Sequence, residues 1–204
     1  MYLVKTPTII TKLFSKSLTW KIPNNEKKIF LTFDDGPIPE LTPAILKYLN
    51  DYHAKATFFC VGENIKKYPN LINDIHLQGH KIGHHTYHHI KGRKTTTDDY
   101  IKDINTSAKL LESNLFRPAY GSITLSQIKR LKTDYRIIMW SILTGDFDIT
   151  LSSEQCLKNA LKAKSGDIIV FHDNLKSMQK IHDILPRFLE HYTKLDYKFS
   201  VIEL

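Results

Sequence analysis

The sequence predicts an α/β protein, because short apolar segments alternate with amphipathic ones from about Lys27 to the C-terminus. Most of the short segments are almost wholly apolar, as strands covered on both faces must be. Such alternation fits either a doubly wound open sheet or a barrel, and periodicity alone does not separate the two. Seven strands are predicted: Lys28–Phe33, Ala56–Val61, Lys81–His85, Leu115–Arg117, Tyr135–Trp140, Asp167–Phe171 and Lys198–Ile202.

Helices between these strands are predicted from their end signals. Ser, Thr and Pro favour the first positions of a helix, Gly favours the position just after it, and an internal Pro interrupts its hydrogen bonds. The predicted helices are one capped by Thr42 with Pro43 at the first helical position, one from Pro69 closed by Gly79, one capped by Thr97 through Leu111, one capped by Ser152 that stops before Gly166, and one from Leu175 to Tyr192 that bends or splits at Pro186.

Length and composition are typical of a soluble globular protein. With 204 residues, of which 42% are hydrophobic and 25% charged, the chain is expected to fold as a single domain over residues 1–204. The net charge of +8 could indicate nucleic-acid binding, but Lys and Arg are spread along the whole chain. We therefore expect solvated basic faces and no nucleic-acid partner. A weak preference for an anionic surface, such as a cell-wall polymer, stays open.

No segment has the length and apolarity of a transmembrane helix. Residues Met1 to Leu18 carry three scattered lysines between short apolar pairs, so this segment lacks the continuous apolar stretch of a signal peptide. Retention in the cytoplasm is the expectation, with an atypical export route left open. Cys60 and Cys156 form no Cys-x-x-Cys pair and are expected to be ordinary buried thiols.

The first predicted strand leads into two adjacent carboxylates, Asp34 and Asp35, followed by the turn formers Gly36 and Pro37. The sites of α/β proteins lie at such carboxyl ends of strands. Alternation along a strand would aim the two side chains in different directions, so one could bind a metal while the other takes a proton. The alternative is a turn in which both carboxylates cap backbone N–H groups.

Histidines are concentrated in one segment, where five of the ten lie between residues 80 and 89. Histidines four apart meet on one face of a helical turn, and imidazole is a favoured ligand for zinc and related ions. A lone histidine is usually structural, but this density favours a metal site. Three pairs have the required spacing, and spacing does not decide between them: His80/His84, His84/His88 and His85/His89.

Three further polar side chains lie at or after the ends of predicted strands. Arg117 could fork onto a carboxylate such as Asp34 or Asp35 and hold it ionised. His172 emerges from a buried strand, and a carboxylate such as Asp146 could orient it and support its charged form. Taken singly, each has an ordinary alternative, namely a surface arginine beside a turn or a structural histidine.

In this order, these segments resemble the polysaccharide deacetylase family, also called carbohydrate esterase family four, from about Ile29 to Asp173. The family's motif Thr-Phe-Asp-Asp-Gly-Pro is intact at residues 32–37, and its motif His-[Ser/Thr]-x-x-His is matched by residues 85–89. The resemblance implies a distorted (β/α) barrel with about seven strands. It also implies a role for each site residue: Asp34 as the catalytic base, Asp35, His85 and His89 as metal ligands, His172 as the general acid, Arg117 steadying the base and Asp146 steadying His172.

The chain departs from the family's pattern at several positions. Residues 117–121 read Arg-Pro-Ala-Tyr-Gly where members usually have Arg-x-Pro-Tyr-Gly, and Phe147 stands where they have Trp. Leu143 occupies a position that is often Asp, and Val170 replaces the Leu of the usual Leu-x-His. These changes concern the acetyl pocket and the substrate, because Phe147 and Val170 are expected to line the space for the methyl group.

The implied function is a metal-dependent deacetylase that hydrolyses the acetamide of N-acetylated sugars, such as peptidoglycan or chitin-type chains containing N-acetylglucosamine. The amine of an amide leaves poorly and must be protonated, so a base and a separate acid are needed. The implied cofactor is one divalent ion, zinc before Co²⁺, Ni²⁺ or Mn²⁺, with the Tyr120 backbone N–H aiding the oxyanion. Two alternatives stay open: an O-acetyl sugar esterase of the acetylxylan type, and a catalytically silent metal- or sugar-binding domain. The oligomeric state is not readable from the sequence.

Overall fold

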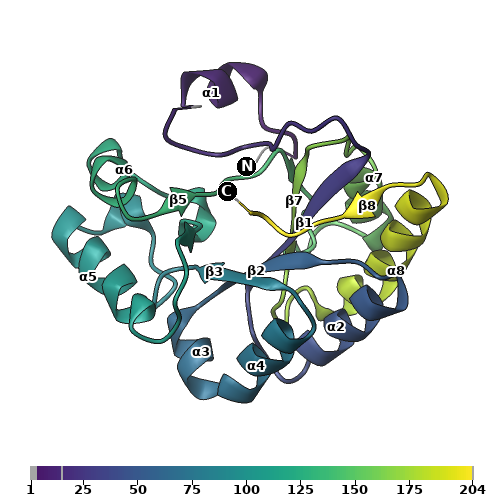
Figure 1. The fold of residues 1–204 in the computed structure, drawn as a ribbon, viewed down its shortest axis with the longest axis horizontal. Coiled ribbons are helices and arrows are strands. Elements are labelled where there is room, and N and C mark those ends of the chain that lie inside the picture. Colours follow the sequence, from purple (N-terminus) through teal and green to yellow (C-terminus); the bar gives the residue numbers. More distant parts are fainter. Residues whose placement is uncertain (1–3, 15, 204) are drawn as a thin grey trace.

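The protein is a curled half-barrel of parallel strands with helices around its outside (Figure 1). The computed structural model describes residues 4–14 and 16–203. Seven strands follow one another in the order β5-β4-β3-β2-β1-β7-β6, and β8 pairs with the start of β1. The predicted distorted barrel is therefore confirmed. The predicted single-domain span of 1–204 includes residues 1–3, 15 and 204, which lie outside the described residues.

The seven predicted strands begin within one residue of the predicted positions, and the three longest lie side by side in the centre. β1 pairs in parallel with β2 on one side and with β7 on the other. Their carboxyl ends therefore meet at one edge of the sheet. The strands are β1 (Lys28–Asp35), β2 (Ala56–Cys60), β3 (Lys81–His84), β4 (Leu115–Phe116), β5 (Arg136–Ile137), β6 (Ile142–Leu143), β7 (Ile168–His172) and β8 (Lys198–Phe199).

The strand predicted over residues 135–140 is shorter than expected, because β5 covers only Arg136–Ile137 and the chain then crosses to the opposite edge of the sheet, where β6 begins. β5 pairs with β4, whereas β6 pairs with β7. Between them the Ile138 N–H donates to Phe116 O (2.8 Å) and the Ser141 N–H donates to Ile168 O (3.0 Å), so residues 138–141 cross from one edge to the other. The run from Ile137 to Leu143 is almost continuously apolar, which hides this crossover from periodicity.

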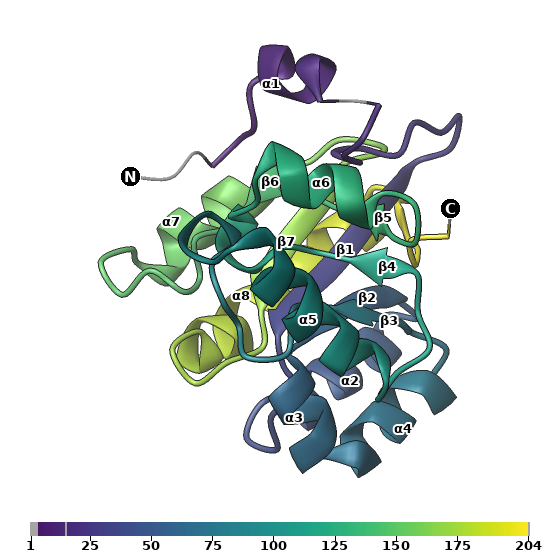
Figure 2. The same ribbon diagram turned by 90° about the vertical axis from the view of Figure 1, so that its left-hand side faces the viewer.

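Helices cover the outer face of the sheet, while α1 lies apart from them at the N-terminal side (Figure 2). Among the described residues, none of these helices has both the length and the apolar character needed to cross a membrane. The helices are α1 (Thr8–Leu13), α2 (Thr42–Asp51), α3 (Gly62–Lys67), α4 (Pro69–Leu77), α5 (Thr97–Ala108), α6 (Leu125–Leu131), α7 (Ser153–Ala160) and α8 (Met178–Lys194), with 3₁₀ turns η1 (Gly92–Lys94) and η2 (Ala119–Gly121).

The predicted helix ends are confirmed in part. Ser152 caps α7, since its side chain accepts from the Gln155 N–H and the Gln155 side chain accepts from the Ser152 N–H. The cap of α5 is Thr96, one residue before the predicted Thr97. Of the bend or split predicted at Pro186, the split is wrong, because α8 runs through this residue. Six buried side chains hold α8 against the core, and their burial outweighs the hydrogen bond that proline removes.

Thr42 is the first residue of α2 rather than its cap, so this prediction is also wrong. The hydroxyl of Thr42 accepts from the Ile38 N–H (2.8 Å) and donates to the Asp173 carboxylate (2.5 Å). The Thr42 hydroxyl, which the sequence suggested as a helix cap, is therefore engaged by Asp173, a residue that follows β7. Leu41 occupies the cap position without a side-chain hydrogen bond.

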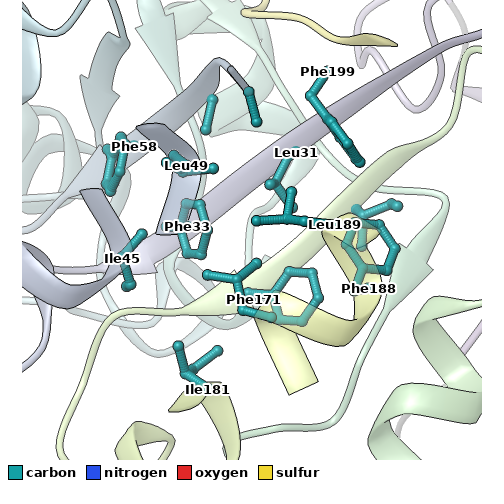
Figure 3. Close-up of a cluster of buried hydrophobic side chains, with 14 of the residues drawn as sticks. Leu31, Phe33, Ile45, Leu49, Phe58, Phe171, Ile181, Phe188, Leu189 and Phe199 are labelled. Atoms are coloured by element: carbon teal, nitrogen blue, oxygen red, sulfur yellow. The ribbon is translucent and has the colours of Figure 1, made fainter. Parts of the chain in front are cut away.

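The largest hydrophobic cluster fills the space between the central strands and helices α2 and α8 (Figure 3). Phe33 of β1 stacks on Phe58 of β2 and Phe171 of β7, with ring centroids 5.0 and 6.0 Å apart. Phe188 of α8 meets Phe171 edge-on at 5.4 Å. This packing fixes β1, β2 and β7 relative to one another and so positions the residues at their ends. The two cysteines are free and buried, as predicted.

Removing the Phe188 ring should destabilise the protein strongly. The side chain is fully buried and contacts three other rings, so Phe188→Ala is expected to lower the free energy of unfolding by about 3–5 kcal/mol. Urea denaturation followed by circular dichroism measures this loss. Leu77→Ala, at a side chain that is 81% exposed, is the control and should change it by less than about 0.5 kcal/mol. Equal effects of the two substitutions would contradict the assignment of this core.

Candidate metal and catalytic site

The register of the parallel strands brings the predicted site residues to one edge of the sheet. In the β1–β7 pair Asp34 lies opposite His172, and in the β1–β2 pair Asp35 lies opposite Cys60. Cys60 in turn lies opposite His84, so His85 follows at the same level. The site is thus assembled from strand ends whose positions are set by the backbone ladder and the core beneath it.

Asp35, His85 and His89 form a candidate metal centre. Each offers one ligand atom, and the three atoms lie within 4.8 Å of one another. Asp35 Oδ1 is 3.1 Å from His89 Nε2 and 3.6 Å from His85 Nε2. Within the described ranges no other cluster of three or more His, Cys, Asp or Glu side chains has this geometry. These are the three residues that the sequence motifs pointed to as ligands.

The tautomer of His85 suits metal binding. Its Nδ1 lies 2.9 Å from the carbonyl oxygen of Arg117, and since a carbonyl only accepts, Nδ1 carries the proton. The lone pair of Nε2 therefore faces Asp35. Burial lowers the pKa of His85 to about 4 in spite of the nearby Asp34 charge, so the ring is neutral near pH 7. A neutral imidazole whose second nitrogen is hydrogen-bonded is the usual form of a ligating histidine.

Asp35 is held at both its backbone and its side chain by asparagines that the sequence analysis missed. Its φ of 81° is in the left-handed region, and the Asn64 Nδ2 donates to its carbonyl oxygen (2.9 Å). The Asn174 Nδ2 donates to Asp35 Oδ2 (2.6 Å). Burial alone would raise the pKa of Asp35, but the hydrogen bond from His89 and the nearby His172 lower it below its usual range. The carboxylate is therefore ionised.

His85 and His89 do not lie on a helical turn, so that expectation is wrong. β3 ends at His84, and the following loop has positive φ values at Thr86 (63°) and His89 (55°). These two left-handed residues fold the loop back, so that both imidazoles reach Asp35. The two histidines four residues apart do meet, as predicted, but the conformation of the loop brings them together and not a helical turn.

The remaining histidines of this segment have other partners. His84 is buried, with Nδ1 3.1 Å from Ser107 Oγ and Nε2 3.2 Å from Ser113 O. His80 accepts from the Ala56 N–H, and His88 Nδ1 lies 2.5 Å from the Asp103 carboxylate. The structure therefore separates the His85/His89 pair from the two alternative pairs of equal spacing.

Arg117 pairs with Asp34, and its surface alternative is wrong because the side chain is completely buried. The Arg117 Nη1 group donates to Asp34 Oδ1 (2.6 Å) and to Thr32 Oγ1 (2.7 Å). The second oxygen of Asp34 lies 4.0 Å from His85 Nε2. One carboxylate oxygen is thus engaged by the guanidinium, while the other faces the candidate metal centre.

His172 is held by Asp146 through two hydrogen bonds. Asp146 Oδ1 lies 2.8 Å from His172 Nδ1, and Asp146 Oδ2 accepts from the His172 N–H (2.7 Å). Burial alone would lower the pKa of His172, but the charge and hydrogen bond of Asp146 raise it to about 9. The ring is therefore protonated near pH 7, and its Nε2 carries a proton that Asp146 does not bind.

Asp173, next to His172, is a buried acid that the sequence analysis did not single out. Its N–H donates to Asp34 O (2.8 Å), and burial raises the pKa of its carboxyl to about 7. A Cβ atom at Gly36 would lie 2.1 Å from Asp173 Oδ2. Any side chain at Gly36 would therefore displace the Asp173 carboxylate, which Thr42 holds by a hydrogen bond.

Of the three residues expected near the acetyl group, two contact a histidine of the site and the third is buried beneath it. Tyr120 has a φ of 58°, and its ring centroid lies 4.5 Å from that of His89. The ring of Phe147 meets that of His172 edge-on at 4.7 Å. Val170 is fully buried two residues before His172 and so lies beneath it on the same face of β7. The contact of Phe147 and Val170 with the acetyl methyl group stays a prediction.

Comparisons with known proteins agree with these motifs. The family model for polysaccharide deacetylases matches residues 21–135. A peptidoglycan-N-acetylglucosamine deacetylase of Bacillus cereus is 34% identical over 193 residues, covering 91% of each chain. A chitooligosaccharide deacetylase of Azorhizobium caulinodans is 31% identical over 161 residues, or 75% of this chain and 77% of the relative. The crystal structure of a peptidoglycan N-acetylglucosamine deacetylase has a TM-score of 0.88 at 31% identity, covering 97% of this chain and 95% of that one.

The geometry of the candidate metal centre predicts which histidines matter for metal affinity. His85→Ala or His89→Ala should remove most of the binding of a divalent ion, because each deletes one of three ligand atoms. His88→Ala should bind as the wild type does. His84→Ala should also keep the ion but unfold more easily, since it loses two buried hydrogen bonds. Calorimetric titration with Zn²⁺ measures the metal affinity of each variant, and thermal denaturation measures its stability. Loss of binding in a folded His84→Ala would contradict the ligand set.

Proposed function

The chain belongs to the polysaccharide deacetylase family, and we propose that it hydrolyses the acetamide of a glycan containing N-acetylglucosamine with one divalent metal ion. One observation carries the proposal. The Asp35, His85 and His89 group lies beside two hydrogen-bonded pairs, Asp34 with Arg117 and His172 with Asp146. The relatives named for N-acetylglucosamine and chitooligosaccharide deacetylation support the substrate class.

The side chains of the metal centre fit a divalent ion. Two imidazoles and one carboxylate are the donor set of many catalytic zinc sites, and the same set also accepts Co²⁺, Ni²⁺ or Mn²⁺. The neutral His85 and the ionised Asp35 are in the protonation states that ligands need. When bound, such an ion supplies a Lewis acid that polarises the acetyl carbonyl and lowers the pKa of water.

Asp34 is assigned as the general base. Its Oδ1 is held by Arg117, so the carboxylate is fixed in direction and its other oxygen faces the centre. That oxygen takes the proton from the attacking water while the new C–O bond forms. The negative charge on the acetyl oxygen is met by the Tyr120 backbone N–H, which lies in the turn immediately after Arg117 and Pro118.

His172 is assigned as the general acid. Its Nδ1 is bound to Asp146, so the Nε2 proton is the one available for transfer. It passes to the sugar nitrogen as the C–N bond breaks, and acetate and a free amine result. An ester needs less help from an acid, because an alkoxide leaves more readily than an amide anion. The His172–Asp146 pair supplies the acid that an amide requires, and the relatives named for N-acetylglucosamine deacetylation favour the amide over the O-acetyl alternative. A silent binding domain would need neither the acid nor the base.

Release of acetate from defined substrates tests the proposal. The purified protein is incubated with N-acetylated chitooligosaccharides, peptidoglycan fragments and acetylxylan, and acetate is measured before and after treatment with a chelator. We expect release from the N-acetylated substrates, loss of activity with the chelator and recovery on adding Zn²⁺. Release from acetylxylan alone would establish the esterase alternative, and no release from any substrate would favour a silent domain.

Replacing Asp34 by Asn should separate the base from the metal ligands. The amide keeps the size of the side chain but cannot accept the proton, so kcat is expected to fall by roughly 10²- to 10⁴-fold. Metal affinity should be retained, because Asp34 is outside the ligand set. Since Arg117 loses its buried partner, thermal denaturation must show that the variant is folded at the assay temperature. Loss of metal from folded Asp34→Asn would show that this carboxylate is a ligand instead.

Replacing His172 by Ala should affect different leaving groups unequally. The defect in kcat is expected to be large on an N-acetylated sugar and small on an activated aryl acetate, whose phenolate departs without protonation. Metal content should equal that of the wild type. Steady-state kinetics with the two substrates measure the difference, and equal defects on both would show that His172 is not the acid.

The pH dependence of kcat should report the His172–Asp146 pair. The acid must be protonated, so activity is expected to fall as pH rises through the pKa of His172, which the charge and hydrogen bond of Asp146 hold above its ordinary value. Asp146→Asn removes the charge that raises this pKa, so the alkaline limb should move down towards the ordinary value of 6.5. A limb at the same pH in both proteins would contradict the assignment.

A further inference from the structure

The carboxylate of Asp35 is divided between the protein scaffold and the candidate metal centre. Its Oδ2 accepts a 2.6 Å hydrogen bond from Asn174 Nδ2. Its Oδ1 lies 3.1 Å from His89 Nε2 and 3.6 Å from His85 Nε2. Rotation about the terminal torsion of an aspartate is soft, so an unrestrained carboxylate would present either oxygen, or both, to a metal ion.

The amide of Asn174 has only one orientation that satisfies its neighbours. Its Oδ1 accepts from the Ser177 N–H at 3.0 Å, which leaves the NH₂ group to face Asp35. Ser177 immediately precedes α8, and α8 is anchored in the core by six buried side chains. The donor to Asp35 is therefore attached to a rigid part of the fold rather than to a free loop.

We infer that Asn174 is a positioning residue for metal binding, which holds Asp35 Oδ2 so that Oδ1 alone faces the ion. This inference rests on the proposed metal-dependent function. One carboxylate oxygen and two imidazole nitrogens would hold the ion with three ligand atoms, which is the number that catalytic sites of this ligand type use. His85 is restrained in the same way by the Arg117 carbonyl, so the carboxylate ligand and this imidazole ligand are each oriented by a hydrogen bond to the protein.

The substitution Asn174→Ser tests the donor without removing the link to α8. A serine hydroxyl reaches the N–H three residues later, as it does at helix ends, so the bond to Ser177 is retained. It lacks the extended NH₂ group and so does not reach Asp35. The Kd of the metal-free protein for Zn²⁺, measured by competition with a chromogenic chelator, is expected to rise by about 10- to 100-fold. The visible spectrum of bound Co²⁺ should change, because the carboxylate no longer presents one fixed oxygen.

Two further variants separate positioning from a structural role. Asn105→Ser makes the same chemical change at an exposed position of α5 and should leave both Kd and spectrum as in the wild type. Asn174→Ala removes both hydrogen bonds, so it should match Asn174→Ser in Kd but have a lower Tm without metal. A folded Asn174→Ser with the Kd and Co²⁺ spectrum of the wild type would overturn the inference, as would a Kd that follows Tm across the variants. A wild-type protein that binds neither ion would instead overturn the proposed function itself.

Discussion

The structure depends on the burial of one guanidinium group. Arg117 has no exposed surface, and its N–H groups donate to Thr32 and Asp34 of β1 and to the carbonyls of Ile138 and Met139. Its planar group also lies 4.1 Å from the centroid of the Phe59 ring. A buried charge is stable only when it is paired and hydrogen-bonded, so these contacts are obligatory. The Arg117 side chain thereby joins two parts of the fold. One is the end of β1 that carries Asp34, and the other is the segment of residues 138–141 that connects the two edges of the sheet.

Each chemically active group of the site uses one atom for the scaffold and leaves another for chemistry. Asp34 gives one oxygen to Arg117, and Asp35 gives one to Asn174. His85 gives Nδ1 to a backbone carbonyl, and His172 gives Nδ1 to Asp146. This arrangement fixes tautomers and directions before any substrate arrives, which is the condition for electrostatic stabilisation and proton transfer without reorganisation. Because these partners follow strand ends or, like Asn174, lie in the short segment between β7 and α8, the precision of the site comes from the core.

The sequence by itself determined the α/β class and the candidate reactive residues, while the resemblance to the family implied the barrel and the role of each residue. Adjacent Asp34 and Asp35 at a strand end, the His85 to His89 spacing and the strand preceding His172 are local features, so they are visible in the chain order. Apolar runs buried on both faces mark parallel strands for the same reason. Local signals also placed the cap of α7 at Ser152.

Only the tertiary structure decided how these residues meet, because the deciding contacts join distant segments. Spacing alone left three histidine pairs open, and two left-handed residues in a loop bring His85 and His89 together at the site. Chain order also left open which carboxylate Arg117 contacts, and in the fold it pairs with Asp34, as the family resemblance implied. Strand β6 is apparent only from its ladder with β7, since the apolar run before it looks like one strand. The partners Asn174 and Thr42 carry no motif, and their roles follow from hydrogen bonds across more than a hundred residues. Such contacts depend on register and packing, which no local pattern encodes.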